Sequence, residues 1–323
     1  MSKYLVTGGS GFIGSAVVKK LLQMGHEVRV FDNNSRGSFE RLSDVIDRCE
    51  FVQGDIRDFD ATLAALKGVD SVIHLAYVNG TKYFYERPSL VLDVAVRGMI
   101  NIIDGCKKLG VGELYLASSS EVYQTPPLIP TPEEIPLVIP DVTNARYSYG
   151  GGKIFCELWA STMCRNDFDK MVVFRPHNVY GPNMGFEHVV PEIICRAYSL
   201  ARSRGTGSIA IQGDGRQTRA FIYIDDFVDG VQALIEKGRS METYNIGTMD
   251  EISIGELASK VETLFALGDA GPSPSLGVPC GSTIRRCPDI TKISELGFNP
   301  VTSLDEGLRK TVEWYASHLS QEN

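Results

Sequence analysis

A chain of 323 residues, of which 43% are hydrophobic and 22% charged, is long enough to bury a large core and has the composition of an ordinary globular protein. Its net charge of −8 argues against nucleic acid or an anionic membrane surface as the main partner. The seven cysteines form no C-x-x-C pair, and Cys280 and Cys287 have no further candidate ligands nearby. We therefore expect reduced thiols in a cytoplasmic protein, and no metal site.

The first predicted strand, residues 4–7, leads directly into a glycine-rich segment. Because this segment lies so near the start of the sequence, we expect no signal peptide, and no apolar run is long enough to span a membrane. Gly8, Gly11 and Gly14 precede and open a predicted helix over 13–24. Glycines at these places permit a tight turn and a close approach of the backbone to a pyrophosphate, while the helix N-terminus offers N–H donors. The spacing therefore predicts a dinucleotide site.

Asp32 follows the second predicted strand, residues 28–31, and favours a dinucleotide site over a plain glycine-rich turn. A carboxylate there can accept hydrogen bonds from an adenosine ribose and repel a 2′-phosphate, which favours NAD over NADP. Arg36 is close enough to weaken that preference, and the alternative for Asp32 is a solvated turn with Asn33 and Asn34. The other predicted cofactor contacts are Phe12, Ile13, Asn33, Asp55, Ile56, Leu75, Ala76, Tyr149 and Lys153.

Four more apolar runs of strand length follow, at residues 50–52, 71–75, 114–117 and 171–174, and helix-like stretches separate most of them. Strands that alternate with helices predict a parallel sheet with right-handed crossovers, and short apolar strands indicate helices on both faces. Beyond residue 174 prolines and glycines become frequent, and residues 268–281 are predicted to form a loop. We therefore expect an α/β fold of the Rossmann type, a doubly wound parallel sheet with a smaller C-terminal lobe.

Tyr149 and Lys153 are four residues apart, so they share one face of a predicted helix. A nearby ammonium, together with a positively charged nicotinamide ring, is expected to lower the pKa of the phenol, which can then exchange a proton with a substrate hydroxyl. Ser119 follows the 114–117 strand and can hold the same oxygen, with Ser120 as the alternative. A chance surface pair is the other interpretation of Tyr149 and Lys153. The glycines at 150–152 indicate either a close approach to cofactor or substrate, or a late start of the helix.

With these motifs the chain resembles the extended short-chain dehydrogenases of the NAD-dependent sugar-nucleotide epimerase/dehydratase family over essentially its whole length. Three later segments add to the resemblance, namely 175–182 (RPHNVYGP), 213–221 (GDGRQTRAF) and 286–292 (RCPDITK). The resemblance implies that NAD is the cofactor, that the substrate is a nucleotide-diphosphate sugar, and that Asn178, Arg219 and Arg286 contact this substrate. Guanidinium groups suit phosphate oxygens, although Arg286 could also be a surface charge beside Arg285.

The resemblance also implies how the chain is divided and assembled. Residues 1–174 are expected to form the NAD-binding domain, with a later segment at about 218–238 returning to it. Residues 175–323 are expected to form mainly the substrate-binding lobe. A homodimer is expected, in which helices near 90–109 and 149–164 pair with their copies, with Ile154, Leu158 and Trp159 as apolar contacts.

Two features depart from the family pattern. Ala95 stands where the family usually has an asparagine, three residues before the glycine of the fourth helix, so one contact near the nicotinamide is expected to be missing. The segment 77–88 is unusually aromatic, and it either shapes a non-standard sugar pocket or packs against the second lobe.

The resemblance leaves three reactions open. The family oxidises a sugar carbon, usually C4, and the product then depends on the second step: re-reduction gives an epimer, loss of water a dehydration product, and loss of carbon dioxide a pentose. The SEVY run around Glu121 resembles dehydratases and UDP-glucuronate decarboxylases, in which this glutamate takes part in the second step. The residues after Ala76 and before Tyr147 do not resemble the decarboxylases, and the Asp-Glu pair of the dTDP-glucose dehydratases is missing.

We therefore expect an epimerase, in particular a 4-epimerase acting through transient oxidation at C4 by tightly bound NAD. The alternative is a UDP-glucuronate decarboxylase or an NDP-sugar 4,6-dehydratase that uses Glu121 as a further catalytic residue. A non-catalytic dinucleotide-binding sensor is a more remote alternative, because Tyr149 and Lys153 are both present.

Overall fold

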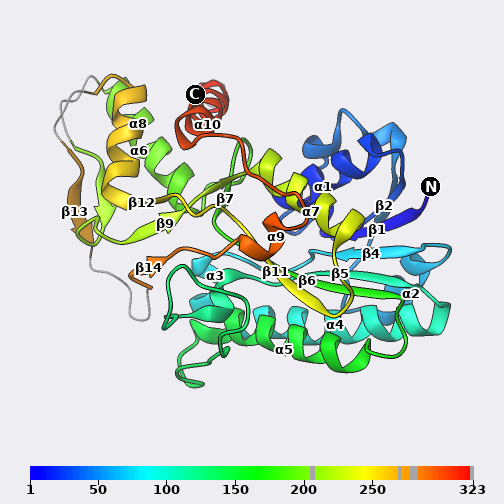
Figure 1. Ribbon diagram of the computed structural model, residues 1–323. Helices are drawn as coiled ribbons and strands as arrows, with labels where there is room; N and C mark the ends of the chain where they lie inside the picture. Colours follow the sequence, from blue (N-terminus) through cyan, green and yellow to red (C-terminus); the bar gives the residue numbers. More distant parts are fainter. Residues whose placement is uncertain (204–207, 268–270, 277–282, 321–323) are drawn as a thin grey trace.

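The computed structural model describes residues 1–203, 208–267, 271–276 and 283–320 (Figure 1). A seven-stranded, all-parallel sheet organises most of the chain, in the order β11-β6-β5-β4-β1-β2-β3. Its strands are β1 (Lys3–Thr7), β2 (Glu27–Asp32), β3 (Glu50–Gln53), β4 (Ser71–His74), β5 (Glu113–Ala117), β6 (Lys170–Pro176) and β11 (Glu242–Ile246). The doubly wound parallel sheet expected from the sequence is therefore present, with six of its strands at the predicted places and β11 in addition.

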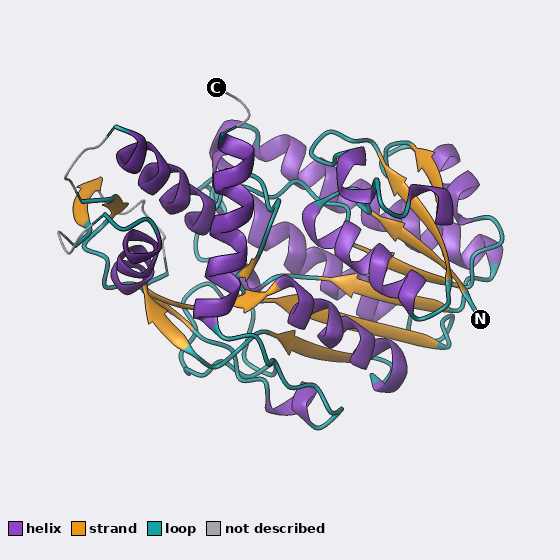
Figure 2. Cartoon of the chain, turned by 90° about the horizontal axis from the view of Figure 1, so that it is seen from above, coloured by secondary structure: helices purple, strands orange, loops and turns teal. Residues whose placement is uncertain are grey.

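Alternate residues of each central strand are buried on opposite faces of the sheet. Leu5 and Val72 pack into one core and Val6 and Ile73 into another, because successive side chains of a strand point to opposite sides. One face is covered by α2 (Phe59–Leu66), α4 (Pro88–Leu109) and α5 (Tyr147–Met163), and the other by α1 (Phe12–Gln23) and α7 (Ile224–Lys237). Both layers are visible in Figure 1, and in Figure 2 helices lie over the strands.

The two cores differ in the parts of the chain that build them. The buried residues of the α4/α5 core all come from positions 5–173. The core on the α1/α7 side begins at Tyr4 and also takes buried residues from β10 (Ile222–Tyr223), α7, β11 and the C-terminal helix α10 (Leu304–Leu319). The second core therefore joins the sheet to the rest of the molecule.

The strand order reverses between β1 and β4, which are neighbours in the sheet but not in the sequence. At their carboxyl ends the Thr7 hydroxyl lies 2.8 Å from His74 Nδ1 and accepts the N–H groups of Leu75 and Ala76. Burial, with the charge of Lys153, lowers the pKa of His74 to about 3, so this imidazole is neutral. In doubly wound sheets ligands bind at such a reversal point.

The second lobe is built from short strands and helices beyond β6, at the left of Figure 1. Its strands are β7 (Val179–Tyr180), β8 (Ala210–Gln212), β9 (Thr218–Ala220), β10, β12 (Glu251–Ser253), β13 (Ser273–Leu276) and β14 (Arg285–Arg286). Its helices are α6 (Val189–Arg202), α8 (Ile254–Leu264), α9 (Thr291–Ser294) and α10. The short elements before it are η1 (Phe39–Leu42), η2 (Ile46–Arg48), α3 (Thr81–Glu86) and η3 (Ser120–Tyr123).

One expectation about this half changes. β9 pairs with β12 and β14, whereas α7 packs on α1 and β11 joins the large sheet, and the returning segment expected at about 218–238 stays a prediction. Residues 273–276 form β13, which pairs with β8, so the loop expected over 268–281 is interrupted by a strand. The parts 268–270 and 277–281 of that loop, with Cys280, lie outside the described residues. The division into two domains stays a prediction.

In the part of the chain that the structure describes, no helix is long and apolar enough to cross a membrane.

Candidate active site

A cavity of about 430 Å³ lies at the carboxyl ends of the central strands, where the sheet meets the second lobe. It brings together residues that the sequence places far apart, and Arg219 is the one predicted site residue that does not line it. The predicted residues that do are Gly8, Gly11, Phe12, Ile13, Gly14, Asp32, Asn33, Asp55, Ile56, Leu75, Ala76, Ser119, Ser120, Glu121, Tyr149, Lys153, Asn178 and Arg286.

The glycine-rich turn has room for nothing larger than hydrogen at two of its positions. Gly8 has φ +71°, and a Cβ there would lie 2.8 Å from the backbone of Ala76. A Cβ on Gly14 would overlap the carbonyl oxygen of Gly8. Helix α1 begins at Phe12, and its N-cap residue Gly11 supplies no side-chain hydrogen bond to the first N–H groups. Residues 11–14 line the cavity, so the start of α1, with N–H groups that no side chain caps, borders it as an anion site that fits a pyrophosphate.

Asp32 is fixed at the edge of the cavity by two backbone N–H groups, from Ser10 at 3.0 Å and from Asn34 at 2.9 Å. Asp32 thus takes part in the turn with Asn34 that was considered as the alternative to a cofactor contact. It nevertheless lines the cavity as well. The Arg36 guanidinium donates to the carbonyl of Asn79 and pairs with Glu187 at 3.0 Å. Because the Arg36 guanidinium is already bound by Asn79 and Glu187, it is not available to bind a 2′-phosphate. This supports the preference for NAD over NADP.

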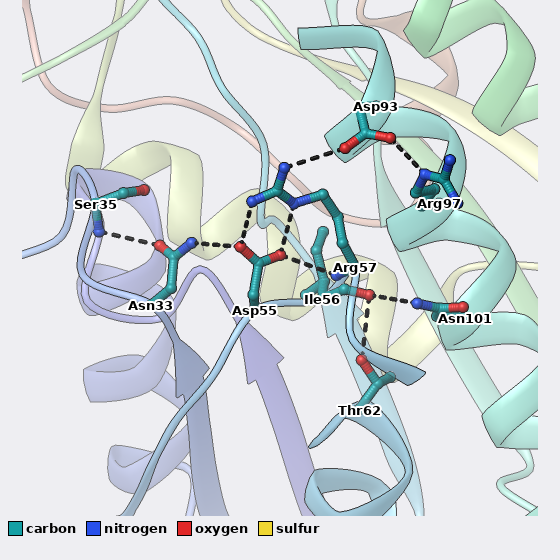
Figure 3. Close-up of polar contacts among 9 residues, drawn as sticks. All are labelled: Asn33, Ser35, Asp55, Ile56, Arg57, Thr62, Asp93, Arg97 and Asn101. Carbon is teal, nitrogen blue, oxygen red and sulfur yellow. Dashed lines mark hydrogen bonds and ion pairs between the residues drawn. The ribbon is translucent and has the colours of Figure 1, made fainter. Parts of the chain in front are cut away.

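Asp55 and its neighbours form a polar network at the end of β3 (Figure 3). The Asp55 carboxylate accepts from Asn33 at 3.1 Å and from Arg57 at 2.8 Å, and Arg57 also pairs with Asp93 on α4 at 3.1 Å. Hydrogen bonds from Arg57 lower the pKa of Asp55 to about 2, although burial acts against this. Ile56 lies in the same turn, and its carbonyl accepts from Asn101 on α4 at 2.9 Å. The cavity wall at this point is therefore tied to α4.

Tyr149 and Lys153 lie on the buried face of α5, next to the end of β5. The Lys153 ammonium donates to the carbonyl of Ala117 at 2.7 Å, and burial lowers its pKa to about 8. Burial raises the pKa of Tyr149 to about 12, while a hydrogen bond with Ser119 opposes the rise. The sequence led us to expect a lowered Tyr149 pKa, caused by the charges of the lysine and of a nicotinamide ring. In the protein without cofactor the Tyr149 pKa is raised instead. The reason is that the phenol is almost completely removed from water.

Glu121 lies on the short helix η3 (Ser120–Tyr123) and bridges three parts of the chain. Its carboxylate pairs with Arg286 on β14 at 2.7 Å and with Arg146, just before α5, at 3.6 Å. Burial would raise the pKa of Glu121, but Arg286, followed by Arg146 and Arg219, brings the net pKa below its ordinary value. Glu121 is therefore held as a carboxylate between guanidinium groups.

The three arginines around Glu121 carry more positive charge than one carboxylate balances. Burial and the nearby Arg286 lower the pKa of Arg219 to about 10, and the Arg219 guanidinium donates to the carbonyls of Thr218 and Thr283. Buried positive charge favours binding of a negatively charged ligand, so the part of the site around these arginines suits an anion. Arg146 was not predicted, although its place just before the catalytic helix could have suggested it.

Asn178 and Ser120 complete the predicted substrate residues. Asn178 has φ +40°, and its side-chain amide donates to the carbonyl of Ala220 at 3.0 Å, so it also joins β7 to β9 of the second lobe. Ser120 is buried at the start of η3.

The glycines at 150–152 make room for neighbouring protein groups. Helix α5 already begins at Tyr147, so it does not start late. A Cβ on Gly150 would lie 2.6 Å from the Gln124 amide nitrogen, and one on Gly152 would overlap the Tyr77 hydroxyl. The close approach is therefore to side chains of this chain, which neither interpretation of the sequence anticipated.

Two aromatic residues of the unusual 77–88 segment surround Tyr149, and sequence reasoning did not assign them. Phe84 stacks on the Tyr149 ring with centroids 4.8 Å apart, and Tyr77 meets it edge to face at 5.0 Å. Both line the cavity. The concentration of aromatic residues was the available signal, and it points to a shaped pocket.

Comparisons with known proteins agree with this geometry. Residues 4–247 match the model of the NAD dependent epimerase/dehydratase family. A dTDP-4-dehydro-6-deoxy-D-allose reductase of a Streptomyces species is 31% identical, covering 97% of this chain and 96% of its own. A UDP-glucose 4-epimerase of Mycolicibacterium smegmatis is 33% identical, covering 96% and 97%. UDP-glucuronic acid decarboxylase 1 of Xenopus tropicalis is 31% identical, covering 99% and 73%.

Among solved structures, the dTDP-glucose 4,6-dehydratase DesIV of Streptomyces venezuelae, crystallised with NAD and TYD, superposes with a TM-score of 0.88. It is 28% identical, and the match covers 99% of this chain and 98% of that one. The relatives thus share one architecture and carry out different reactions.

Proposed function

Since the chain belongs to the NAD-dependent epimerase/dehydratase family and its relatives are enzymes, we propose that it is a nucleotide-sugar 4-epimerase. The relatives' names divide among an epimerase, a decarboxylase, a reductase and a dehydratase, so the choice of reaction depends on this chain's own residues. The observation that carries it is the state of Glu121, whose carboxylate is held between Arg286 and Arg146.

The site residues fit NAD as the cofactor. The glycine turn and the open N-terminus of α1 would hold the pyrophosphate, and Asp32 would accept hydrogen bonds from the adenosine ribose. Asn33, Asp55 and Ile56 would border the adenine. When bound, NAD supplies the reversible oxidation of a sugar alcohol to a ketone.

The chain's own residues would manage the proton of that alcohol. The Tyr149 phenol would exchange a proton with the sugar oxygen, and the Ser119 hydroxyl would hold the same oxygen. The Lys153 ammonium, buried beside them, would stabilise negative charge on the phenol after it gives up its proton. Epimerisation needs no more proton chemistry than this, because the oxygen that loses a proton regains it.

The anionic part of the substrate would lie against Arg286, with Ser120 and Asn178 beside it, and the Arg219 guanidinium would add positive charge from outside the cavity lining. This arrangement matches a nucleoside diphosphate, in which two phosphates need guanidinium or N–H partners. We therefore propose a nucleotide-diphosphate sugar as the substrate class.

Decarboxylation or dehydration remains the second candidate because Glu121 lines the same cavity as Tyr149. If Arg286 turned to a bound diphosphate, the Glu121 carboxylate would lose a partner and could act on the sugar. A diphosphate at Arg286 would accompany either reaction. The difference is that decarboxylation or dehydration requires the released Glu121 carboxylate to act on the sugar, whereas epimerisation gives it no proton to move.

A substrate panel tests the proposal. The purified protein is incubated with UDP-, GDP-, CDP- and dTDP-sugars, and the products are analysed by chromatography and mass spectrometry. An isomer of unchanged mass is expected, whereas loss of water or of carbon dioxide would establish the second candidate. Tyr149→Phe serves as the control, and its turnover should fall by about 10²–10⁴-fold with nucleotide affinity nearly intact. Absence of turnover in the unsubstituted protein with every sugar would favour a dinucleotide sensor.

A further inference from the structure

Tyr77 contacts both members of the Tyr149–Lys153 pair. It lies on a different part of the chain, in the segment that follows β4. The Lys153 nitrogen lies 3.9 Å from the centroid of the Tyr77 ring. The same ring meets the Tyr149 ring edge to face, with centroids 5.0 Å apart and an interplanar angle of 78°. One aromatic side chain thus covers the ammonium and supports the phenol.

A glycine makes room for the Tyr77 side chain. A Cβ on Gly152 would overlap the Tyr77 hydroxyl and would lie 3.0 Å from the Cβ of Ala95 on α4. The Tyr77 hydroxyl lies 3.4 Å from the carbonyl of Tyr149. Gly152 on α5 therefore leaves a space that the phenol of Tyr77 occupies.

The groups that face Lys153 leave its charge without a carboxylate partner. His74 on β4 is neutral, and Tyr149 and Cys156 on α5 carry protonated groups because burial raises their pKa values. The Glu157 carboxylate, also on α5, acts against the lowering of the Lys153 pKa without forming an ion pair with Lys153, because it is bound by Arg175 at 2.6 Å. Within residues 1–203, 208–267, 271–276 and 283–320, no ion pair involves Lys153, whose described partners are the Ala117 carbonyl and the Tyr77 ring.

The face of an aromatic ring is negative, so it attracts a cation, and it does so more strongly where water is excluded. Burial lowers the Lys153 pKa to about 8, close to neutral pH. A modest attraction therefore decides how much of the lysine is charged. Tyr77 itself cannot supply a negative charge, because burial raises its pKa well above the ordinary value.

We propose that Tyr77 is a positioning residue, which uses the face of its ring to hold the Lys153 ammonium in place and to keep it charged beside Tyr149. The catalytic importance of this arrangement rests on the proposed function, but its electrostatic part is a property of the protein alone. Gly152 is the small residue that this arrangement requires.

The test compares Tyr77→Leu with Tyr77→Phe. Phenylalanine keeps the ring face and loses only the hydroxyl, whereas leucine removes the ring. The Lys153 side chain is titrated directly by NMR of isotopically labelled lysine, and its signal is assigned as the one that Lys153→Met removes. In Tyr77→Leu the proton affinity of Lys153 should fall about tenfold, which lowers its pKa by about one unit, and in Tyr77→Phe it should be nearly unchanged.

A phenylalanine carrying several ring fluorines at position 77 gives a second measurement if leucine disturbs folding. Fluorine withdraws charge from the ring face but keeps its shape, so the Lys153 pKa should fall with each added fluorine. Equal Lys153 pKa values for the leucine, phenylalanine and fluorinated variants would overturn the proposal.

Activity is measured on the same variants. The alkaline limb of kcat/KM should move to lower pH in Tyr77→Leu and stay in place in Tyr77→Phe. The NMR titration needs no substrate, so failure of the epimerase proposal would show as absent turnover while the lysine titration still decides the role of Tyr77.

Discussion

At the scale of single residues, Glu121 separates the possible reactions. Its carboxylate joins η3 to Arg286 and Arg146, and this bridge is the role that its geometry supports. Removing a buried partner of an ion pair leaves the other charge uncompensated, so a stability cost is expected whichever reaction is correct. The chemistry must therefore be judged from the cofactor and the product rather than from stability.

For an epimerase, Glu121→Gln should lower kcat by less than about tenfold, or roughly 1.4 kcal/mol of barrier, because no second proton needs to be removed. The measurement is turnover, together with the near-ultraviolet absorbance of the reduced cofactor. Glu251→Gln is the matched control, because Glu251 pairs with Arg285, the neighbour of Arg286 on β14, and does not line the cavity. Accumulation of reduced cofactor with little product in Glu121→Gln alone would overturn the preference for an epimerase.

Lys153 links activity to stability at the same scale. Burial lowers its pKa from 10.5 to about 8, so between these two values the unfolded chain binds the extra proton. The contribution of Lys153 to the free energy of unfolding is therefore unfavourable below pH 8, and it is relieved as the pH rises from about 8 to 10.5.

At pH 7 the free energy of unfolding of Lys153→Met should consequently exceed that of the unsubstituted protein by on the order of 1–3 kcal/mol. The variant should therefore unfold at a higher temperature, although it loses activity. The advantage should shrink toward pH 10, because the lysine is then largely neutral in both states. Thermal unfolding at the two pH values measures this, with the exposed Lys67→Met as the control. A constant difference across this pH range would contradict the assigned shift.

At the scale of elements, Arg36 ties together three loops at the mouth of the cavity. Its guanidinium, on the loop after β2, donates to Asn79 after β4 and pairs with Glu187 before α6, and it lies 4.8 Å above the Tyr83 ring. Gly80, with φ +125°, allows the approach, because a Cβ there would lie 2.9 Å from an Arg36 nitrogen. These loops border the cavity from both lobes.

Arg36→Met should therefore weaken retention of NAD. The pair with Glu187 is partly exposed, so a loss of about two- to fivefold in affinity is expected, in line with roughly 0.2–1 kcal/mol for such pairs. Cofactor that remains after gel filtration is released by denaturation and identified by chromatography. Lys19→Met, which breaks another partly exposed pair on α1, should leave retention unchanged. Tighter binding of NADP than of NAD by the unsubstituted protein would show that Asp32 has been misinterpreted.

Local patterns predicted the strands that contain an apolar run, and they failed where polar residues interrupt the strand. The first six strands contain such runs, and each appears within two residues of its predicted limits, including β3 at one edge of the sheet. β11 was missed because polar residues alternate with apolar ones in its sequence ETYNI, and β13 because proline and serine indicate a loop. Composition and periodicity therefore predicted the layers of the fold but not every strand of the sheet.

For the site, sequence spacing predicted groups that lie close together along the chain. The glycine turn and the Tyr149–Lys153 pair are of this kind. The contact of Glu121 with Arg286 joins residues 165 positions apart, and that of Arg36 with Glu187 joins residues 151 apart. Such contacts form only when distant segments of the chain pack together, and the spacing of residues in a single sequence does not show which segments will meet.

At the scale of the whole molecule, α4 and α5 lie together beneath the sheet in Figure 1 and present apolar side chains to solvent. Leu158 on α5 is 66% exposed and Leu92 on α4 is 41% exposed, while Ile154 and Trp159 are partly covered. A second copy packing on these helices would bury this surface in a four-helix bundle.

Light scattering at micromolar concentration should therefore give the mass of a homodimer. Leu158→Glu should shift it to a monomer, because a charge would then be placed in an apolar interface. Leu264→Glu, at a leucine that is 42% exposed on α8 in the other lobe, should leave the dimer intact. A monomer mass for the unsubstituted protein would refute the prediction.

The unequal origin of the two cores has a consequence for biosynthesis. All buried residues of the α4/α5 core belong to positions 5–173, so this side of the sheet can close as soon as that stretch has left the ribosome. The opposite side waits for β10, α7, β11 and finally Tyr315 near the end of the chain. Until then the nascent chain exposes apolar residues such as Val6 and Ile73, and during this interval it is open to aggregation and to binding by chaperones.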